Sequence, residues 1–236
     1  MNLKQKIELI KNEIHETVAG TKTNPDNVRI ICVTKYAKIE DVISIIKLGY
    51  YNIAENYLQE VSRKKELLKS VLSLEQFEKI NWHFIGHLQR NKAAEVIKFA
   101  SLIQSVDSLR LAERIDQIAA KTEEKVNILI QVDISNEESK FGISFLDLEE
   151  LLDKVLKLPN LKIQGLMGIG PLVEDPEASR IGFKQLKFYF DKMNVYLQNN
   201  KYPRMTTLSM GMSNDYKIAL QEGSTMIRIG SAIFGG

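Results

Sequence analysis

The sequence predicts a single (β/α)8 TIM barrel with an extra N-terminal helix, formed by residues 1–236 as one domain. Two observations support this. Short apolar runs alternate with amphipathic stretches along the chain, and no Pro- or Gly-rich linker divides it. Eight strands, each but the last followed by a helix, imply parallel pairing with right-handed crossovers. An open doubly wound sheet is the alternative architecture.

The first element is a helix near residues 3–19, which the turn Asn24-Pro25-Asp26-Asn27 separates from the first strand. The expected strands lie near residues 29–35, 51–55, 81–86, 101–105, 126–133, 161–167, 206–210 and 225–230. The expected helices between them lie near residues 39–48, 56–69, 88–99, 108–121, 144–157, 177–199 and 213–222. Ser144-Phe-Leu-Asp147 reads as a variant capping box, and Asp175-Pro176 places a proline at a helix start.

Composition and charge exclude several classes of protein. Lys and Arg total 32 and Asp and Glu 30, and no clustered basic stripe suggests nucleic-acid binding. The run Arg63-Lys64-Lys65 is interpreted as a solvated helix face. The one cysteine, Cys32, sits in an apolar run and is assigned to packing. Without a signal-peptide core or an apolar stretch of ~20 residues, we expect a cytoplasmic protein with no membrane partner.

Polar residues and glycines collect where the expected strands end. In a barrel of this class the functional site lies at the carboxyl ends of the strands, so these residues are expected to converge. They are Lys35, Glu55-Asn56, Gly86-His87, Asp107, Asp133, Ser135, Met167-Gly168, Ser209 to Ser213 and Arg228 to Ser231.

Lys35 closes the first strand. The strand period of two puts Ile31, Val33 and Lys35 on one face, so Lys35 is expected to enter the mouth of the barrel. A partly buried amine loses its proton more easily and is a candidate for Schiff-base chemistry. The alternative is a surface lysine that extends its ammonium to solvent at a strand end.

The last strand and the loop before it suggest a phosphate site. Alternation puts Met226, Arg228 and Gly230 on the inner face, and an inward arginine requires an anion or acceptor. Leu208-Ser-Met-Gly-Met-Ser213 ends a strand and leads into a helix expected from Asn214, where backbone N–H groups and the Ser213 hydroxyl suit a phosphate. The alternatives are a structural salt bridge for the arginine and a plain N-cap for the serine.

Two histidines four residues apart, His83 and His87, raise the question of a metal site. The segment that carries them reads as a strand and its exit, and no obvious third ligand accompanies them, so no metal is expected. His87 is better placed as a residue of a ligand pocket. Neither a P-loop nor a dinucleotide fingerprint is present.

Seven segments, taken in order, resemble the pyridoxal phosphate homeostasis protein family, whose barrel is similar to the N-terminal domain of alanine racemase. The resemblance covers nearly the whole chain. Two departures from the family pattern are Lys35-Tyr-Ala-Lys38, which lacks the usual proline, and Ala54, which replaces the usual glycine. The matching segments are Val33-Thr-Lys35, Glu55-Asn-Tyr-Leu-Gln-Glu60, Trp82-His-Phe-Ile-Gly-His-Leu-Gln89, Glu137-Glu-Ser-Lys140, Gly165-Leu-Met167, Leu208-Ser-Met-Gly-Met-Ser213 and Gly223-Ser-Thr-Met-Ile-Arg-Ile-Gly-Ser-Ala-Ile-Phe-Gly235.

The resemblance implies that the chain binds pyridoxal 5′-phosphate (PLP) as an imine on Lys35. It implies that Arg228 faces the pyridine nitrogen and that Ser213, Gly230 and Ser231 hold the phosphate. It also implies that the pocket is lined by Asn56, His87, Ser209 and Met212. The function that follows is carrying or buffering PLP in vitamin B6 homeostasis, with apo-PLP enzymes as possible recipients and a monomeric state expected.

A non-catalytic role is the expectation from the chemistry of Arg228. Enzymes that use the full electron sink of PLP place a carboxylate at the pyridine nitrogen, whereas arginine is always a donor and requires that nitrogen to be unprotonated. Alanine racemases share this arginine but have a second domain that supplies a catalytic tyrosine, and this chain ends just past the last strand. Two alternatives remain. One is a PLP-dependent racemase or lyase whose second base is Tyr36, Tyr57 or His87, and the other is a cofactor-free enzyme that acts on a phosphorylated metabolite through Lys35.

Overall fold

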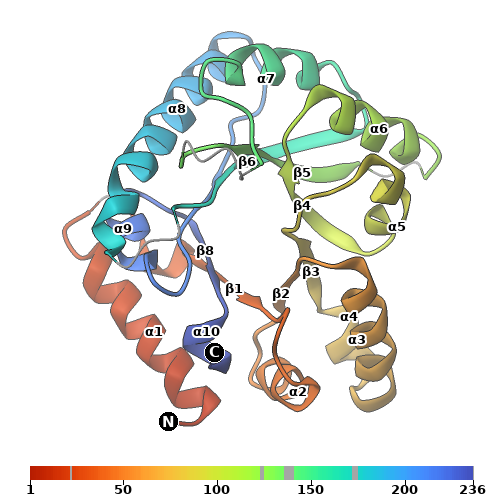
Figure 1. Cartoon of the computed structure of the whole chain (residues 1–236), viewed down its shortest axis with the longest axis vertical. Coiled ribbons are helices and arrows are strands. Elements are labelled where there is room, and N and C mark those ends of the chain that lie inside the picture. The colour runs from red at the N-terminus through yellow and green to blue at the C-terminus, as the bar shows by residue number, and fades with distance from the viewer. Residues whose placement is uncertain (22, 123–124, 136–140, 172–174, 236) are drawn as a thin grey trace.

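Eight parallel strands close into a barrel in which each strand pairs with its sequence neighbours and β8 pairs with β1 (Figure 1). The computed structural model describes residues 1–21, 23–122, 125–135, 141–171 and 175–235. The predicted closed barrel is confirmed, and the open doubly wound alternative is excluded. The strands are β1 (Arg29–Val33), β2 (Asn52–Glu55), β3 (Asn81–Phe84), β4 (Ala100–Val106), β5 (Val126–Val132), β6 (Leu161–Gly168), β7 (Thr207–Ser209) and β8 (Met226–Ile229).

Helices surround the barrel, and each expected helical stretch contains one (Figure 1). Two short helices that the sequence analysis did not anticipate are α4 and α10. The α-helices are α1 (Leu3–Val18), α2 (Ile39–Lys47), α3 (Leu58–Val71), α4 (Leu74–Glu78), α5 (Ala93–Ile97), α6 (Leu109–Ala119), α7 (Leu148–Leu156), α8 (Arg180–Asn199), α9 (Tyr216–Gln221) and α10 (Ser231–Phe234). Single 3-10 turns are η1 (Pro25–Asn27), η2 (Arg90–Lys92) and η3 (Pro176–Ser179). Within the described residues, no helix is long and apolar enough to cross a bilayer.

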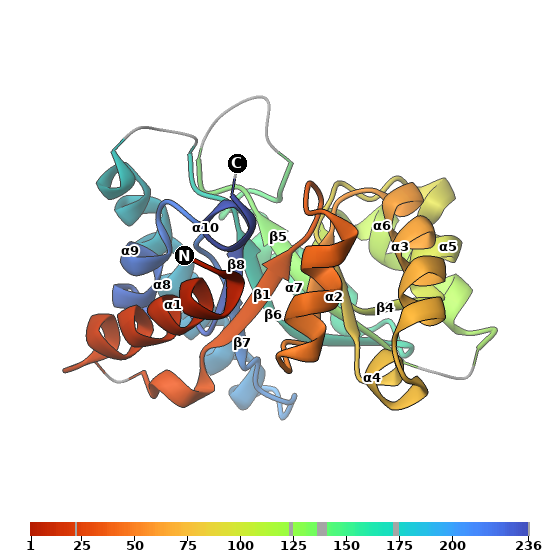
Figure 2. The ribbon, with the colours of Figure 1, turned by 90° about the horizontal axis from the view of Figure 1, so that it is seen from below.

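The extra N-terminal helix α1 begins with a capping box. The Asn2 side chain accepts a hydrogen bond from the Gln5 backbone N–H at 2.9 Å, and the Gln5 side chain accepts one from the Asn2 backbone at 3.0 Å. Ile7, Ile10 and Ile14 follow the helical period and are buried. Figures 1 and 2 show α1 beside α10, so the first and last helices of the chain cover the same side of the barrel.

The two faces of the strands pack against different partners, as the period of two predicts. Ile31 and Val33 belong to the cluster inside the barrel, and so does Met226 of β8. Ile30 and Cys32 point outward and pack with α1, α9 and α10. Register pairs Ile31 with Arg228, which places the inner faces of β1 and β8 side by side.

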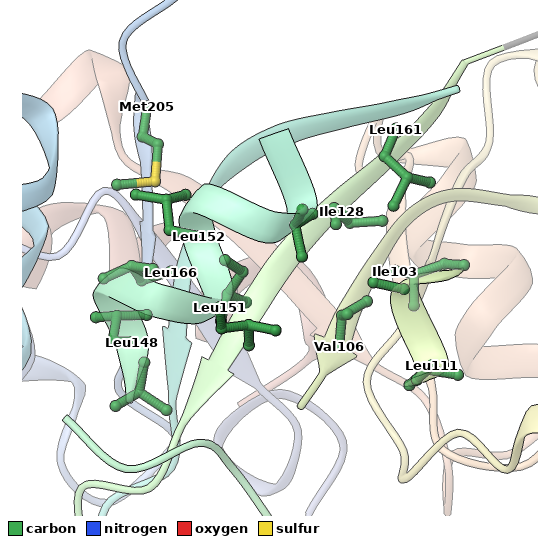
Figure 3. Packing of buried hydrophobic residues seen from close by; sticks show 14 of the residues in the cluster. Ile103, Val106, Leu111, Ile128, Leu148, Leu151, Leu152, Leu161, Leu166 and Met205 are labelled. Atoms are coloured by element: carbon green, nitrogen blue, oxygen red, sulfur yellow. The ribbon is translucent and has the colours of Figure 1, made fainter. Parts of the chain in front are cut away.

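The largest apolar layer lies between the strands and the outer helices (Figure 3). There, side chains from β4, β5 and β6 meet those from α6 and α7, and both faces of these strands are therefore covered, as in other parallel sheets. Among the buried residues that Figure 3 labels are Ile103, Val106, Leu111, Ile128, Leu148, Leu151, Leu152 and Leu166.

Three local predictions are corrected by the structure. Ser144 and Asp147 do exchange hydrogen bonds, but they close the turn before α7, which begins one residue later. The helix expected from Asn214 begins at Tyr216, and its N-cap is Asp215. Lys64, interpreted as part of a solvated face, is fully buried. Its ammonium pairs there with Glu55, at the end of β2.

Candidate functional site

A cavity of about 680 Å³ lies at the carboxyl ends of β1, β2, β3, β6, β7 and β8. Its wall includes the apolar side chains Val33, Ile85 and Ile169, which continue the inner core of the barrel. The site therefore lies at the end of the barrel that the sequence predicts. Seven of the nine predicted site residues line it, namely Lys35, Asn56, Met212, Ser213, Arg228, Gly230 and Ser231.

Lys35 reaches this cavity from a tight turn. The Ala37 backbone N–H donates to the Thr34 carbonyl at 2.9 Å, and Lys35 and Tyr36 are the two central residues of the turn. Lys35 is partly buried, and its Nζ lies 5.0 Å from the centre of the exposed Tyr36 ring. Lys35 thus lines the cavity, with its ammonium beside an aromatic face.

Arg228 on β8 is almost completely buried, with 3% of its surface exposed. Its Nη1 donates to Ser209 Oγ at 2.7 Å and its Nη2 to the Gly168 carbonyl at 2.9 Å. Burial lowers the pKa of the guanidinium to about 10, and nearby Asp215 opposes that shift. Within the described part of the chain, the Arg228 guanidinium donates to a hydroxyl and a carbonyl and forms no ion pair, so the salt-bridge alternative from the sequence is not the arrangement found.

A hydrogen-bonded chain continues from Arg228 into the barrel. Ser209 Oγ donates to Gln104 Oε1 at 2.7 Å, and Gln104 Nε2 lies 3.0 Å from His83 Nδ1. His83 is buried, and desolvation lowers its pKa to about 3, so the ring is neutral. Ser209 therefore lies beneath the cavity and contacts Arg228, which itself lines it.

Backbone N–H groups converge on the hydroxyl of Ser213. Both Gly230 and Ala232 donate to Ser213 Oγ, each at 3.2 Å. The loop that carries Ser213 is closed by Asp215, whose Oδ1 accepts from the Met212 backbone at 2.6 Å. Ser213 and Gly230 both line the cavity, and because the Ser213 oxygen accepts these two bonds, its hydroxyl proton is free to donate to an oxyanion there.

Asn56 contributes a buried acceptor without a partner. Its Oδ1 has no hydrogen bond within the described residues although Asn56 lines the cavity. The backbone of Asn56 is closely packed, since a Cβ at Gly86 would lie 2.1 Å from its carbonyl oxygen. A buried polar atom of this kind calls for a hydrogen-bond donor from outside the protein, in solvent or in a ligand.

His87 lies outside this cavity. It lines a neighbouring cavity of about 740 Å³ together with Asp107, and its Nδ1 is 3.4 Å from Asp107 Oδ2. Its ring stacks on Phe141 with 3.6 Å between centroids. The segment Glu137-Glu-Ser-Lys140, which also supports the family resemblance, lies outside the described residues.

Sequence reasoning missed two buried residues near the site, Asp215 and Lys64, and it expected Glu55 at the site itself, whereas Glu55 does not line the cavity. Asp215 lines the cavity and accepts from Ser179 Oγ at 3.0 Å, and it was missed because the helix was expected to begin at Asn214, before it. The Glu55–Lys64 pair lies behind the turn that carries Lys35. A lysine between two other basic residues on a helix gave no signal of burial.

The chain is similar to known proteins over nearly its whole length. The family model described as alanine racemase, N-terminal domain, matches residues 3–236. The pyridoxal phosphate homeostasis protein of Haemophilus influenzae is 33% identical over 235 residues, covering 100% of this chain and 96% of that protein. The protein of the same name from Escherichia coli K12 is 34% identical over 231 residues, covering 96% and 93%.

Solved structures give the same result. PipY of Synechococcus elongatus with PLP bound has a TM-score of 0.78 and 31% identity, and the match covers 94% of this chain and 100% of that one. An alanine racemase of Clostridium difficile has a TM-score of 0.69, with 100% of this chain and 56% of that one covered. At 16% identity, this second likeness shows the fold alone. By its full-length match to the family model and to these relatives, the chain belongs to the alanine racemase N-terminal domain family and, within it, to the pyridoxal phosphate homeostasis proteins.

Proposed function

We propose that this chain binds pyridoxal 5′-phosphate in the cavity at the barrel mouth, and that it carries or buffers the cofactor without turning over amino acids. The observation that carries the proposal is the presence of the Lys35 amine and the buried Arg228 guanidinium in one cavity. Family membership supports it, since the PipY structure contains PLP.

The residues of the cavity suit the chemical groups of this cofactor. Lys35 would hold its aldehyde carbon as an imine, and Arg228 would donate to its pyridine nitrogen. Ser213, Gly230 and Ser231 would hold the phosphate, where backbone donors already converge on an oxygen. The unpartnered Asn56 Oδ1 fits a hydroxyl donor, and Met212 and Ser209 complete the proposed set. His87 lies outside the cavity, and its predicted role in binding stays a proposal.

The arrangement around Arg228 supports a carrier role over catalysis. PLP supplies an electron-withdrawing ring, and its strength as an electron sink depends on a protonated pyridine nitrogen. A guanidinium remains a donor even with its pKa lowered to about 10, so at neutral pH it accepts no proton from that nitrogen and stabilises its unprotonated form. Arg228 itself is oriented by Ser209 and Gly168, which are neutral.

The racemase or lyase alternative depends on a second base. Of the three candidates, Tyr36 lines the cavity, while Tyr57 and His87 do not. Tyr36 is 82% exposed, so its hydroxyl is not held in place by surrounding side chains of the cavity. We therefore keep the carrier role as the proposal, with the barrel acting as one monomeric domain in the cytoplasm and releasing PLP to apo-enzymes. A lysine–aldehyde link is reversible when a second amine is present, which permits that release.

The test is an assay of the PLP-loaded protein with single enantiomers of alanine and other amino acids. We expect no racemisation, decarboxylation or transamination above the rate of free PLP. The same protein is expected to reactivate an apo-PLP enzyme in a coupled assay. Turnover that disappears in Lys35→Ala would establish the racemase or lyase alternative, and a purified protein without PLP absorbance after loading would favour the cofactor-free enzyme.

A further inference from the structure

A fully buried ion pair lies directly behind the turn that carries Lys35. Lys64 of α3 and Glu55 at the end of β2 are both 0% exposed, and Lys64 Nζ lies 2.6 Å from Glu55 Oε1. Thr34 Oγ1 donates to the same carboxylate oxygen at 2.5 Å. The cluster therefore joins the ends of β1 and β2 to α3, immediately outside the cavity.

The ammonium of Lys64 makes a second contact that an ion pair alone does not require. It donates to the Thr34 carbonyl oxygen at 2.5 Å, and that oxygen also accepts from the Ala37 backbone N–H at 2.9 Å. The carbonyl is thus held from two sides, by the closing bond of the turn and by the buried lysine. Thr34 N–H donates to the Ala54 carbonyl at 3.0 Å, so both backbone polar groups of Thr34 are engaged.

Burying a charged pair carries a desolvation penalty, and replacement of such pairs by apolar side chains of similar volume is often neutral or stabilising. Filling the space behind β1 therefore does not require Lys64 and Glu55. What the ammonium supplies, and an apolar side chain cannot, is a charged hydrogen-bond donor to the backbone one residue before Lys35. Glu55 keeps that donor in place.

We propose that Lys64 is a positioning residue for Lys35: with Glu55 as its anchor, it fixes the Thr34–Ala37 turn so that the Lys35 amine enters the cavity. The inference deepens the proposed function of the cavity and rests on it in one respect, that Lys35 is the residue that holds PLP. The orientation of Lys35 in the cofactor-free chain is independent of that assumption.

The experiment compares wild type with Lys64→Met and with the double variant Glu55→Leu/Lys64→Met, which removes both charges. The first readout is trace reductive methylation of the cofactor-free chain, with Lys35 labelling measured by mass spectrometry relative to exposed Lys162. The second is the dissociation constant for PLP. In both variants we expect Lys35 labelling to change at least two-fold and the dissociation constant to rise at least ten-fold.

Two controls separate positioning from stability. Lys69→Met removes an exposed lysine of the same helix and is expected to match wild type in both readouts. Ile115→Ala opens a cavity in the outer core, away from the site, and is expected to lower the melting temperature without changing PLP affinity. If Lys64→Met fails to fold, the double variant carries the test, because it leaves no unpaired buried charge.

The outcomes are distinguishable. A double variant that regains both wild-type PLP affinity and wild-type Lys35 labelling would show that the pair serves stability alone, and the inference would be wrong. If wild type itself binds no PLP, the proposed function fails, while the labelling of Lys35 still decides whether Lys64 positions it.

Discussion

Arg228 and Ser209 are joined by a hydrogen bond of 2.7 Å from the guanidinium to the hydroxyl, and Ser209 donates onward to Gln104 over the same distance. Because the serine uses its one proton toward Gln104, its oxygen is left to accept from Arg228. The arginine is thereby oriented by a series of hydrogen bonds to uncharged side chains inside the barrel. Its positive charge remains available to a group in the cavity.

Replacement of Arg228 by Gln tests whether the positive charge of Arg228 binds a group in the cavity. Arg228→Gln is expected to weaken PLP binding by roughly 10- to 100-fold, because a charge-assisted hydrogen bond contributes about 1.5–3 kcal/mol. It is also expected to shift the absorption spectrum of the bound PLP, whose pyridine nitrogen loses a donor. Equilibrium dialysis and absorbance spectroscopy measure both effects. Arg204→Gln, at an exposed position, is the matched control. Unchanged affinity and spectrum would mean that Arg228 has a structural role only.

Lys35→Ala is expected to abolish the imine absorbance and the adduct that borohydride traps, since Lys35 is the lysine that lines the described cavity. Peptide mapping by mass spectrometry identifies the modified lysine in the wild type. Lys38→Ala, three residues further on at the exposed start of α2, should leave the adduct intact. Detection of the wild-type adduct on another lysine, for example Lys140, would overturn the assignment.

Buried His83 makes the fold sensitive to acid. Its pKa is lowered to about 3 in the native protein by desolvation first and by the charge of Arg29 second, against 6.5 for a free histidine. Below about pH 6.5 the unfolded chain therefore binds a proton that the native chain does not, and the free energy of unfolding falls until the pH reaches about 3. We expect His83 to account for a loss of roughly 2.5 kcal/mol between about pH 7 and about pH 4.5.

Urea unfolding of His83→Gln at both pH values measures this contribution. The variant should lose less stability on acidification than wild type, because glutamine does not titrate. His15→Gln is the control, since the His15 side chain is 54% exposed. Equal acid sensitivity in wild type and His83→Gln would show that another group is responsible.

Substitutions at two glycines distinguish an effect on fold stability from an effect on PLP binding. A Cβ at Gly165 would lie 1.6 Å from the Thr207 carbonyl on β7, and one at Gly86 would lie 2.1 Å from the Asn56 carbonyl at the cavity. Both Gly165→Ala and Gly86→Ala are expected to destabilise the fold by about 1–3 kcal/mol or more, as overpacking does. Only Gly86→Ala should also weaken PLP binding beyond the loss of folded protein, as measured by titration at low temperature. Equal losses of affinity in the two variants would contradict a local role for Asn56.

The barrel and most of the residues that line the candidate cavity could be predicted from the sequence, because both follow from local rules. Period-two alternation placed Ile31 and Arg228 on inner faces, and parallel strands bring their carboxyl ends together, which is why Lys35 and Gly230 meet at one cavity. Contacts between distant segments were not predictable in this way. Pairing of β7 with β8 brings Ser213 near Gly230, but the sequence did not indicate that the Ser213 hydroxyl accepts from both Gly230 and Ala232, which follow it by 17 and 19 residues.

Lys64 was misread for the same reason. Its neighbours Arg63 and Lys65 suggested solvent, while its partner Glu55 lies nine residues earlier on a different element. A sequence pattern reports the period of an element, but burial of a single charged side chain depends on how that element docks. The four-residue helix α10 was missed because it is too short to show a period.

The buried thiol of Cys32 has a practical consequence for following the opening of the barrel. It is 0% exposed on the outer face of β1, packed with α1, and desolvation raises its pKa to about 12. A thiol-specific reagent at neutral pH therefore reaches a reactive thiolate only after the covering helices, α1, α9 and α10, have moved away from β1. Since the chain has no other cysteine, the labelling rate reports exposure of this one position. Its response to added PLP would show whether a ligand at one end of β1 slows movement of the helices that cover the outer face of the strand.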